Sequence, residues 1–266
     1  MVPGALYGQN HYKTFIELLR ESVDEGSIPM SRIDDAITRI LRVKYDLGLF
    51  DDPYGKVERS SQVGSEKNRQ VARDAVKMSM VLLKNESSAL PLNKDEKITV
   101  VGSGANNLGM QNGGWTVEWQ GRSTPDLKTL DSDKNEELSF SEVTSYFKSA
   151  YDSKYDAGNV EGFFKNLDKD SDKVVSMEEF TAFATESPFQ PSGTSILNAL
   201  EGASNSQDLV TYDPRAENLS KGEVIVAVVG ENPYAEGIGD NPTIELSSFD
   251  KAVLKRCYDC LLYTSD

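Results

Sequence analysis

Two acidic stretches of the chain repeat one order of residue types. Residues 131–142 read Asp-Ser-Asp-Lys-Asn-Glu-Glu-Leu-Ser-Phe-Ser-Glu, and residues 168–179 read Asp-Lys-Asp-Ser-Asp-Lys-Val-Val-Ser-Met-Glu-Glu. Their starts are 37 residues apart, and the residues between them carry apolar and aromatic side chains at helical spacing. Position 8 is apolar in both, as two neighbouring loops need if they pair through a short β bridge. The pattern predicts two helix–loop–helix units that pack as a pair.

We call these stretches the first and second acidic loops. Their spacing follows that of a calcium-binding EF-hand loop, in which oxygen ligands come from positions 1, 3, 5, 9 and 12 and from the main-chain carbonyl of position 7. The predicted ligands of the first loop are Asp131, Asp133, Asn135, the carbonyl of Glu137, Ser139 and Glu142. Those of the second loop are Asp168, Asp170, Asp172, the carbonyl of Val174, Ser176 and Glu179. A single loop that matches the EF-hand pattern would also be compatible with an acidic surface turn. Two matching loops with helices between them predict two Ca²⁺ sites.

Both loops depart from the EF-hand pattern at position 6. Glycine usually stands there because the chain turns sharply, whereas these loops have Glu136 and Lys173. A side chain in the left-handed conformation costs about 1 kcal/mol, and Lys173 also places a positive charge beside the expected ion. The helix that enters the first loop is short, residues 124–130. We therefore expect a modest affinity for calcium.

The only two tryptophans, Trp115 and Trp119, lie in a stretch rich in glycine and amide side chains, residues 107–121, which we call the tryptophan loop. An indole ring stacks on the apolar face of a sugar ring, while Asn and Gln amides bond its hydroxyl groups. On composition alone, a loop in which both rings plug a core is an equal alternative.

The rest of the chain alternates helices and strands. Apolar spacing predicts three helices, at 11–24, after Pro29 and at 65–80. Ser31 and Asp34 are the predicted capping pair of the second helix. A candidate strand at 81–84 follows the third helix. Strands are predicted at 97–101 and 223–230, and helices at 194–203 and 247–258. This order is typical of an α/β fold with a mostly parallel sheet sandwiched by helices, whose ligands gather at the carboxyl ends of the strands.

The glycines after the first strand, Gly102-Ser-Gly104, are similar to a dinucleotide-binding fingerprint. The third glycine position holds Asn107, however, and no helix is expected to open there, which argues against a nucleotide site.

The charge balance limits the classes of partner. A net charge of −15 argues against nucleic acid and anionic membranes as partners, and it is compatible with a cation-binding region.

No apolar run approaches membrane-spanning length and no signal peptide opens the chain, so either the protein is intracellular or its natural start lies elsewhere. Cys257 and Cys260 lack a second pair and a neighbouring histidine, which favours ordinary thiols over a zinc site. The N-x-S triplets at Asn85 and Asn218 fit a secreted glycoprotein but also arise by chance.

Several longer motifs point to one family. They are Met1-Val-Pro-Gly, Gly26-Ser-Ile-Pro-Met-Ser-Arg-Ile-Asp-Asp-Ala-Ile-Thr-Arg-Ile-Leu-Arg-Val-Lys-Tyr-Asp-Leu-Gly-Leu-Phe50, Val81-Leu-Leu-Lys-Asn85, the tryptophan loop, Gly193-Thr-Ser-Ile-Leu197 and Val228-Val-Gly-Glu-Asn-Pro-Tyr-Ala-Glu-Gly-Ile-Gly-Asp240. Together they closely resemble glycoside hydrolase family 3, in its β-glucosidase and exo-β-glucanase branch, over residues 1–121 and 193–255.

The resemblance implies a domain organisation. Residues 1–50 would be the terminal helices of a (β/α)8 barrel, 51–65 an interdomain linker, and 66–122 with 193–266 an α/β sandwich domain cut short at its C-terminal end. Residues 123–192 would be an inserted, all-α EF-hand pair that the family pattern lacks. From Cys257 onward the chain leaves the family pattern.

The resemblance also implies an activity, the retaining hydrolysis of terminal β-D-glucosyl residues of β-glucans or β-glucosides. Its nucleophilic Asp would lie upstream, on the missing barrel domain of the same polypeptide, and its acid/base Glu downstream, so this chain would lack both. Glu231 and Glu236 would only shape the loop after the second strand. Trp119 matches the tryptophan that stacks on the sugar of the leaving-group subsite, and Trp115 would support the loop. The family favours a secreted protein.

Two further interpretations remain. In the first, the chain is a module that binds calcium and carbohydrate but has no catalytic activity. Because few residues separate Gly121 from Asp131, we also expect that calcium, by ordering the insertion, stiffens the tryptophan loop.

Overall fold

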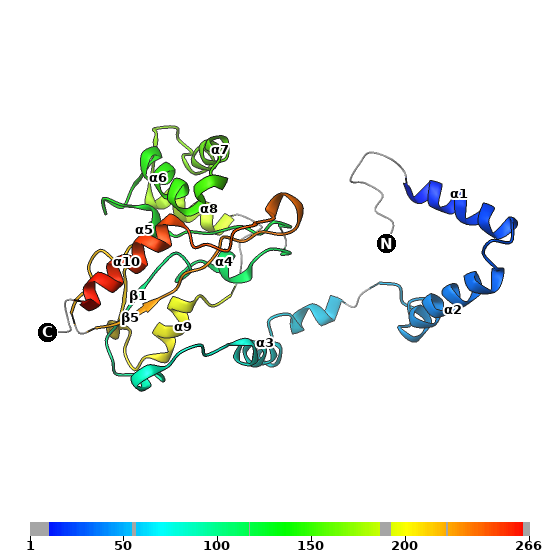
Figure 1. Ribbon diagram of the computed structural model, residues 1–266, viewed down its shortest axis with the longest axis horizontal. Coiled ribbons are helices and arrows are strands. Elements are labelled where there is room, and N and C mark those ends of the chain that lie inside the picture. Colours follow the sequence, from blue (N-terminus) through cyan, green and yellow to red (C-terminus); the bar gives the residue numbers. More distant parts are fainter. Residues whose placement is uncertain (1–10, 55–56, 117, 187–192, 222, 263–266) are drawn as a thin grey trace. The chain divides into compact units, whose positions relative to one another are not determined.

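The computed structural model describes residues 11–54, 57–116, 118–186, 193–221 and 223–262, and the chain divides into two units, residues 1–84 and 85–266. The first unit contains helices α1 (His11–Asp24), α2 (Met30–Asp46) and α3 (Glu66–Ser79) and the 3₁₀ turn Val57–Gln62 (Figure 1). All three helices lie where apolar spacing predicts them.

Two local predictions for this unit are wrong. Helix α2 begins at Met30, directly after Pro29, so Ser31 already lies inside the first turn and no side chain caps the helix. Residues 81–84 form no strand, and no strand of the described residues pairs with them.

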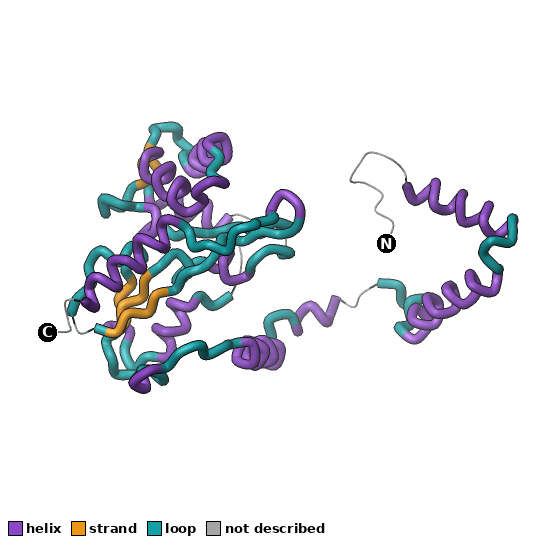
Figure 2. The backbone as a smooth tube through the Cα atoms, in the orientation of Figure 1, coloured by secondary structure: helices purple, strands orange, loops and turns teal. Residues whose placement is uncertain are grey.

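A three-stranded parallel sheet forms the centre of the second unit (Figure 2). Strand β1 (Ile98–Val101) lies between β4 (Val210–Tyr212) and β5 (Val224–Ala227), with Thr99 opposite Thr211 and Ile225. The α/β prediction is confirmed. Because all three strands are parallel, their carboxyl ends lie at one edge of the sheet, as ligand-binding α/β sheets require.

Helices cover both faces of this sheet (Figure 1). Alternate residues of a strand point to opposite faces. Val100 packs in one cluster with Leu197 of α9 (Ile196–Ala203), and Val101 packs in another with Val253 of α10 (Ser248–Leu262). Each of the three side chains Val100, Val101 and Val253 is fully buried.

Residues 123–186, which we call the helical segment, pack against α10. The segment contains α5 (Leu127–Leu130), α6 (Phe140–Tyr151), α7 (Ala157–Leu167) and α8 (Met177–Glu186). The rings of Tyr146 in α6 and Phe249 in α10 meet edge to face at 5.3 Å, and buried residues of the segment share one core with the sheet. The helical segment and the sheet therefore form one packed body.

The two acidic loops pair as predicted. Strands β2 (Leu138–Ser139) and β3 (Val174–Val175) are antiparallel, with Leu138 opposite Val175 and both side chains fully buried. Among the described residues no helix has the length and apolar composition needed to cross a bilayer.

A short helix, α4 (Leu108–Asn112), opens where none was expected. The side chain of Asn107, which is 1% exposed, accepts a hydrogen bond from the Met110 N–H at 3.0 Å and so caps it. Asn is among the best N-cap residues, so the residue that breaks the glycine fingerprint is the one that starts the helix.

Candidate functional site

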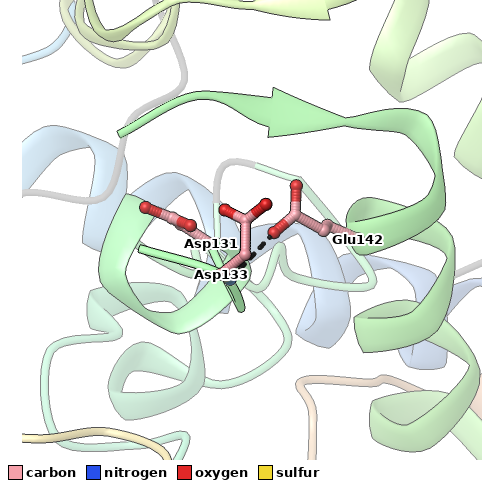
Figure 3. A group of neighbouring side chains, drawn as sticks. All are labelled: Asp131, Asp133 and Glu142. Carbon is pink, nitrogen blue, oxygen red and sulfur yellow. Dashed lines mark hydrogen bonds between the residues drawn. The ribbon is translucent and has the colours of Figure 1, made fainter. Parts of the chain in front are cut away.

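The first acidic loop gathers three carboxylates. Asp131, Asp133 and Glu142 each place an oxygen within 4.8 Å of the other two (Figure 3). Asp131 also holds the turn, since its two oxygens accept from the backbone N–H groups of Lys134 and Glu136 at 2.7 and 3.0 Å. The loop is therefore wound around the carboxylate of its first residue.

Glu142 closes the first loop. It forms a capping box with Ser139, in which the Ser139 N–H donates to Glu142 at 2.9 Å and the Glu142 N–H donates to the Ser139 hydroxyl at 3.3 Å. Its other oxygen accepts from the N–H of Ser132 at 2.8 Å. Burial acts to raise its pKa, but the hydrogen bonds from Ser139 and Ser132 hold the pKa of Glu142 below its ordinary value.

The second loop repeats these contacts. The carboxylates of Asp168, Asp170 and Asp172 gather within 4.8 Å of one another. Glu179 accepts from the N–H of Ser176 at 2.9 Å and from the N–H of Lys169 at 2.7 Å, and the Ser176 and Lys169 backbone bonds are the main reason that the pKa of Glu179 lies below its ordinary value. Glu179 thus takes the place that Glu142 has in the first loop.

The middle positions also correspond between the loops. The Glu137 N–H donates to Asn135 at 2.8 Å, and the Val174 N–H donates to Asp172 at 2.8 Å. Glu136 and Lys173 have φ values of 65° and 76°, so position 6 adopts the left-handed conformation in both loops, with the strain expected for a residue other than glycine.

One oxygen of the second loop lacks a partner. Asp168 Oδ1 is buried and has no hydrogen bond among the described residues, although it lies beside the carboxylates of Asp170 and Asp172. A buried, unpaired carboxylate oxygen among like charges is unfavourable, and a bound cation would relieve both costs. The donor set consists of hard oxygens, which suits calcium.

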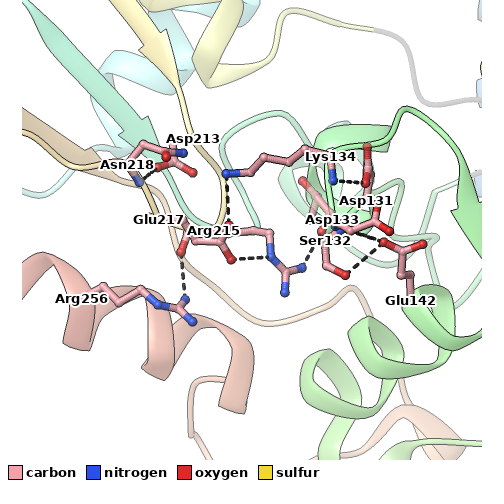
Figure 4. A network of polar contacts seen from close by, with 11 residues as sticks. Asp131, Ser132, Asp133, Lys134, Glu142, Asp213, Arg215, Glu217, Asn218 and Arg256 are labelled. Carbon is pink, nitrogen blue, oxygen red and sulfur yellow. Dashed lines mark hydrogen bonds and ion pairs between the residues drawn. The ribbon is translucent and has the colours of Figure 1, made fainter.

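An ionic network ties the first loop to the α/β core (Figure 4). Lys134 and Arg215 both pair with Glu217, at 3.3 and 3.2 Å. Arg215 also donates to the carbonyl of Thr129 at 3.1 Å, and Arg256 donates to the carbonyl of Arg215 at 2.9 Å. Sequence reasoning missed this network, because its members are far apart in the chain and none belongs to a motif.

The tryptophan loop presents its two indole rings on the surface. Trp115 is 66% exposed and Trp119 is 44% exposed, and the rings lie edge to face with centroids 6.1 Å apart. The backbone N–H of Trp115 donates to the backbone carbonyl of Trp119 at 2.8 Å, which closes the loop. The alternative that both rings plug a core is therefore wrong.

The tryptophan loop docks on the loop that follows β5, residues 230–241. Gln120 accepts from the N–H of Ala235 at 2.9 Å and donates to the carbonyl of Glu236 at 3.2 Å. Glu231 accepts from the Tyr234 hydroxyl and from the Asn241 amide, both at 3.0 Å, so it does shape this loop as predicted.

A buried carboxylate joins the ends of β1 and β5. Asp250, which is fully buried, accepts from the N–H and hydroxyl of Ser103 at 3.1 and 2.7 Å and from the N–H of Gly230 at 3.4 Å. Burial raises its pKa, while these hydrogen bonds oppose the rise. Nothing in the local sequence singles out Asp250, since its partners come from two other elements.

The fold and its loops define an α/β domain that carries the tryptophan loop at the carboxyl edge of its sheet. The model of the glycosyl hydrolase family 3 C-terminal domain matches residues 80–260, and the chain belongs to this family. The matched range includes residues 123–192, so the family match alone does not distinguish these residues from the rest of the domain.

Named relatives agree with the family. The chain is 37% identical over 112 residues to the lysosomal beta glucosidase of Dictyostelium discoideum, a match of 41% of this chain and 14% of the relative. It is 39% identical over 101 residues to the periplasmic beta-glucosidase of Salmonella typhimurium, covering 36% of this chain and 13% of the relative. The matched part is thus a small share of either relative.

The exo-1,3/1,4-beta-glucanase of a Pseudoalteromonas species has a similar structure. The TM-score is 0.58 at 28% identity, and the match covers 94% of this chain and 25% of the glucanase.

Proposed function

We propose that this chain is part of a β-glucosidase-like hydrolase and that its tryptophan loop binds a β-glucan or β-glucoside. The observation that carries the proposal is the exposure of two indole rings on a loop held by Gln120 at the edge of the sheet. Exposed rings on a fixed backbone offer a sugar a preorganised stacking surface at little entropic cost. The names of the relatives support the substrate class.

The reaction itself would need groups from outside the matched residues. By family resemblance the nucleophilic Asp belongs to a preceding barrel and the acid/base Glu to a later loop. The apolar side chains of α2 support a packing partner of this kind, because Ile37, Ile40 and Leu41 are 47%, 57% and 45% exposed. Residues 1–50 would then be the last helices of that barrel.

Replacing Trp119 tests the sugar site. Trp119→Ala is expected to weaken the binding of a β-gluco-oligosaccharide about tenfold, because a lost stacking face is worth roughly 1.4 kcal/mol. Trp115→Ala should cost less if Trp115 mainly supports the loop. Calorimetric titration measures both, with Tyr258→Ala, an exposed aromatic residue on α10, as the control. Equal affinity of the Trp119→Ala variant and the unaltered chain would refute the proposal.

We also propose that the acidic loops are an EF-hand pair that binds two Ca²⁺ ions. The clustered carboxylates, the unpaired Asp168 oxygen and the common left-handed turn support it. The ligands would be those predicted from the spacing, and calcium would neutralise the repulsion among them. The strain at Glu136 and Lys173 favours modest affinity.

Paired substitutions separate ion binding from a general charge effect. Calcium should raise the Tm of the unaltered chain, and Glu142→Gln with Glu179→Gln should abolish that rise, since position 12 supplies two oxygens. The matched control is Glu137→Gln with Glu178→Gln, which removes the same charge from neighbours that are not predicted to bind through their carboxylates. If the control variant loses as much of the calcium-induced rise in Tm as Glu142→Gln with Glu179→Gln does, the rise comes from diffuse charge screening and not from two binding sites.

A second function, calcium-stabilised sugar binding without catalysis, fits the same loops. The upstream coding sequence distinguishes the two: an intact barrel domain that carries the nucleophilic Asp favours the enzyme.

A further inference from the structure

A hollow of about 850 Å³ lies between the helical segment and the end of the tryptophan loop. One wall comes from Glu118, residues 121–126 and Pro233, and the other from α6, α7 and α8. Its volume is in the range of pockets that hold small molecules, which span roughly 300–1,000 Å³. No residue of this hollow is among those predicted to bind calcium.

The helical wall of the hollow is aromatic. Phe147 and Tyr151 stack with an interplanar angle of 12° at 5.5 Å, and Phe163 lies 5.3 Å from Phe147. Tyr155, Phe180 and Phe183 also line it, and all six rings are only partly buried. The parts of these rings that line the hollow give it an apolar aromatic surface, against which the apolar face of a sugar ring can pack.

Polar side chains also line the hollow, beside apolar ones such as Leu108 and Val160. Glu118 and Arg122 pair at 3.0 Å while their side chains stay 36% and 39% exposed. Asn159 and Asn166, both exposed on α7, add amides to the rim. Amides and charged groups beside aromatic faces are the combination that recognises a polyhydroxylated ligand.

We propose that this hollow is a second saccharide-binding site, which holds units of a β-glucan chain beyond those at Trp119. The proposal rests on the function proposed above. The hollow reaches the tryptophan loop, because Glu118, which directly precedes Trp119 in the chain, is one of its lining residues. The helical segment thereby extends the binding surface and makes the protein selective for longer oligosaccharides.

Titration with two ligands, a β-gluco-disaccharide and a β-gluco-hexasaccharide, tests the site on the whole chain. The unaltered chain should bind the hexasaccharide at least tenfold more tightly. Tyr155→Ala should reduce this preference at least fivefold and leave the disaccharide Kd unchanged, whereas Trp119→Ala should weaken both ligands. Asn166→Ala, on the exposed surface of α7, gives a second variant that leaves the aromatic packing intact, and Tyr258→Ala is the control.

Each outcome decides the proposal. A preference for the longer ligand that both hollow variants retain would overturn the second site and leave the Trp119 site standing. Equal affinity of the unaltered chain for both ligands would do the same. Binding of neither ligand would overturn the proposed function and the second site together.

Discussion

Glu142 and Glu179 hold their loops through the same set of hydrogen bonds, so both carboxylates are held in their charged form. The pKa of each lies below its ordinary value. An acid with a lowered native pKa stabilises the fold at pH values above its unfolded pKa, and that stability is lost as the pH falls through the native pKa. The loops should therefore loosen in acid.

Urea unfolding without metal at pH 6, 4.5 and 3 measures this effect, because the stabilisation is lost between the unfolded pKa of the glutamate and its lower native pKa. Stability should fall over this range, and the fall should be smaller in Glu142→Gln, because Gln still closes the capping box but carries no titrating charge. Glu137→Gln, whose carboxylate makes none of the Ser139 or Ser132 bonds, should follow the unaltered chain. An identical slope in Glu142→Gln would show that this carboxylate does not stabilise the fold through its charge.

At the scale of elements, the tryptophan loop depends on close contact with the loop at residues 230–241. A Cβ at Gly114 would overlap the carbonyl of Tyr234. Gly114→Ala should therefore separate the two loops, lower stability by about 1–3 kcal/mol and weaken sugar binding although both tryptophans remain. Thermal unfolding and titration measure the two effects.

The control for Gly114→Ala is Gly202→Ala in α9, where a Cβ meets nothing within 4 Å. It should leave sugar binding unchanged and stabilise the helix by about 0.5–1 kcal/mol. Normal sugar affinity in Gly114→Ala would mean that the contact with Tyr234 does not position the loop.

The elements show why some features could be predicted and others could not. Leu138 and Val175 pair as predicted, because loop spacing is a local property of the sequence. Strand β4 was missed, since three residues are too short to show a period. Asp250 and Arg215 were missed for a different reason: their roles come from partners that only the fold brings near. The exposure of Trp119 likewise depends on how its loop docks.

At the scale of the second unit, a chain of contacts joins the acidic loops to the tryptophan loop. Glu142 lies in the first turn of α6, and near the other end of this helix the carbonyl of Ala150 accepts from the Asn232 amide at 2.9 Å. Lys154 donates to the carbonyl of Gly239 at 3.2 Å. Both contacts end on the 230–241 loop, which holds Gln120. We propose that order gained at the acidic loops reaches the indole rings through these contacts.

Tryptophan fluorescence reports on this coupling directly, because both tryptophans of the chain lie in the tryptophan loop. Calcium, but not magnesium, should change the fluorescence and raise the Tm over the same concentration range. Asn232→Ala combined with Lys154→Ala should keep the rise in Tm and lose most of the fluorescence change, since the pair removes both side-chain contacts with the 230–241 loop and leaves the acidic loops intact. A rise in Tm with silent tryptophans in the unaltered chain would contradict the coupling, because the ion would then stabilise the helical segment without reaching the sugar site.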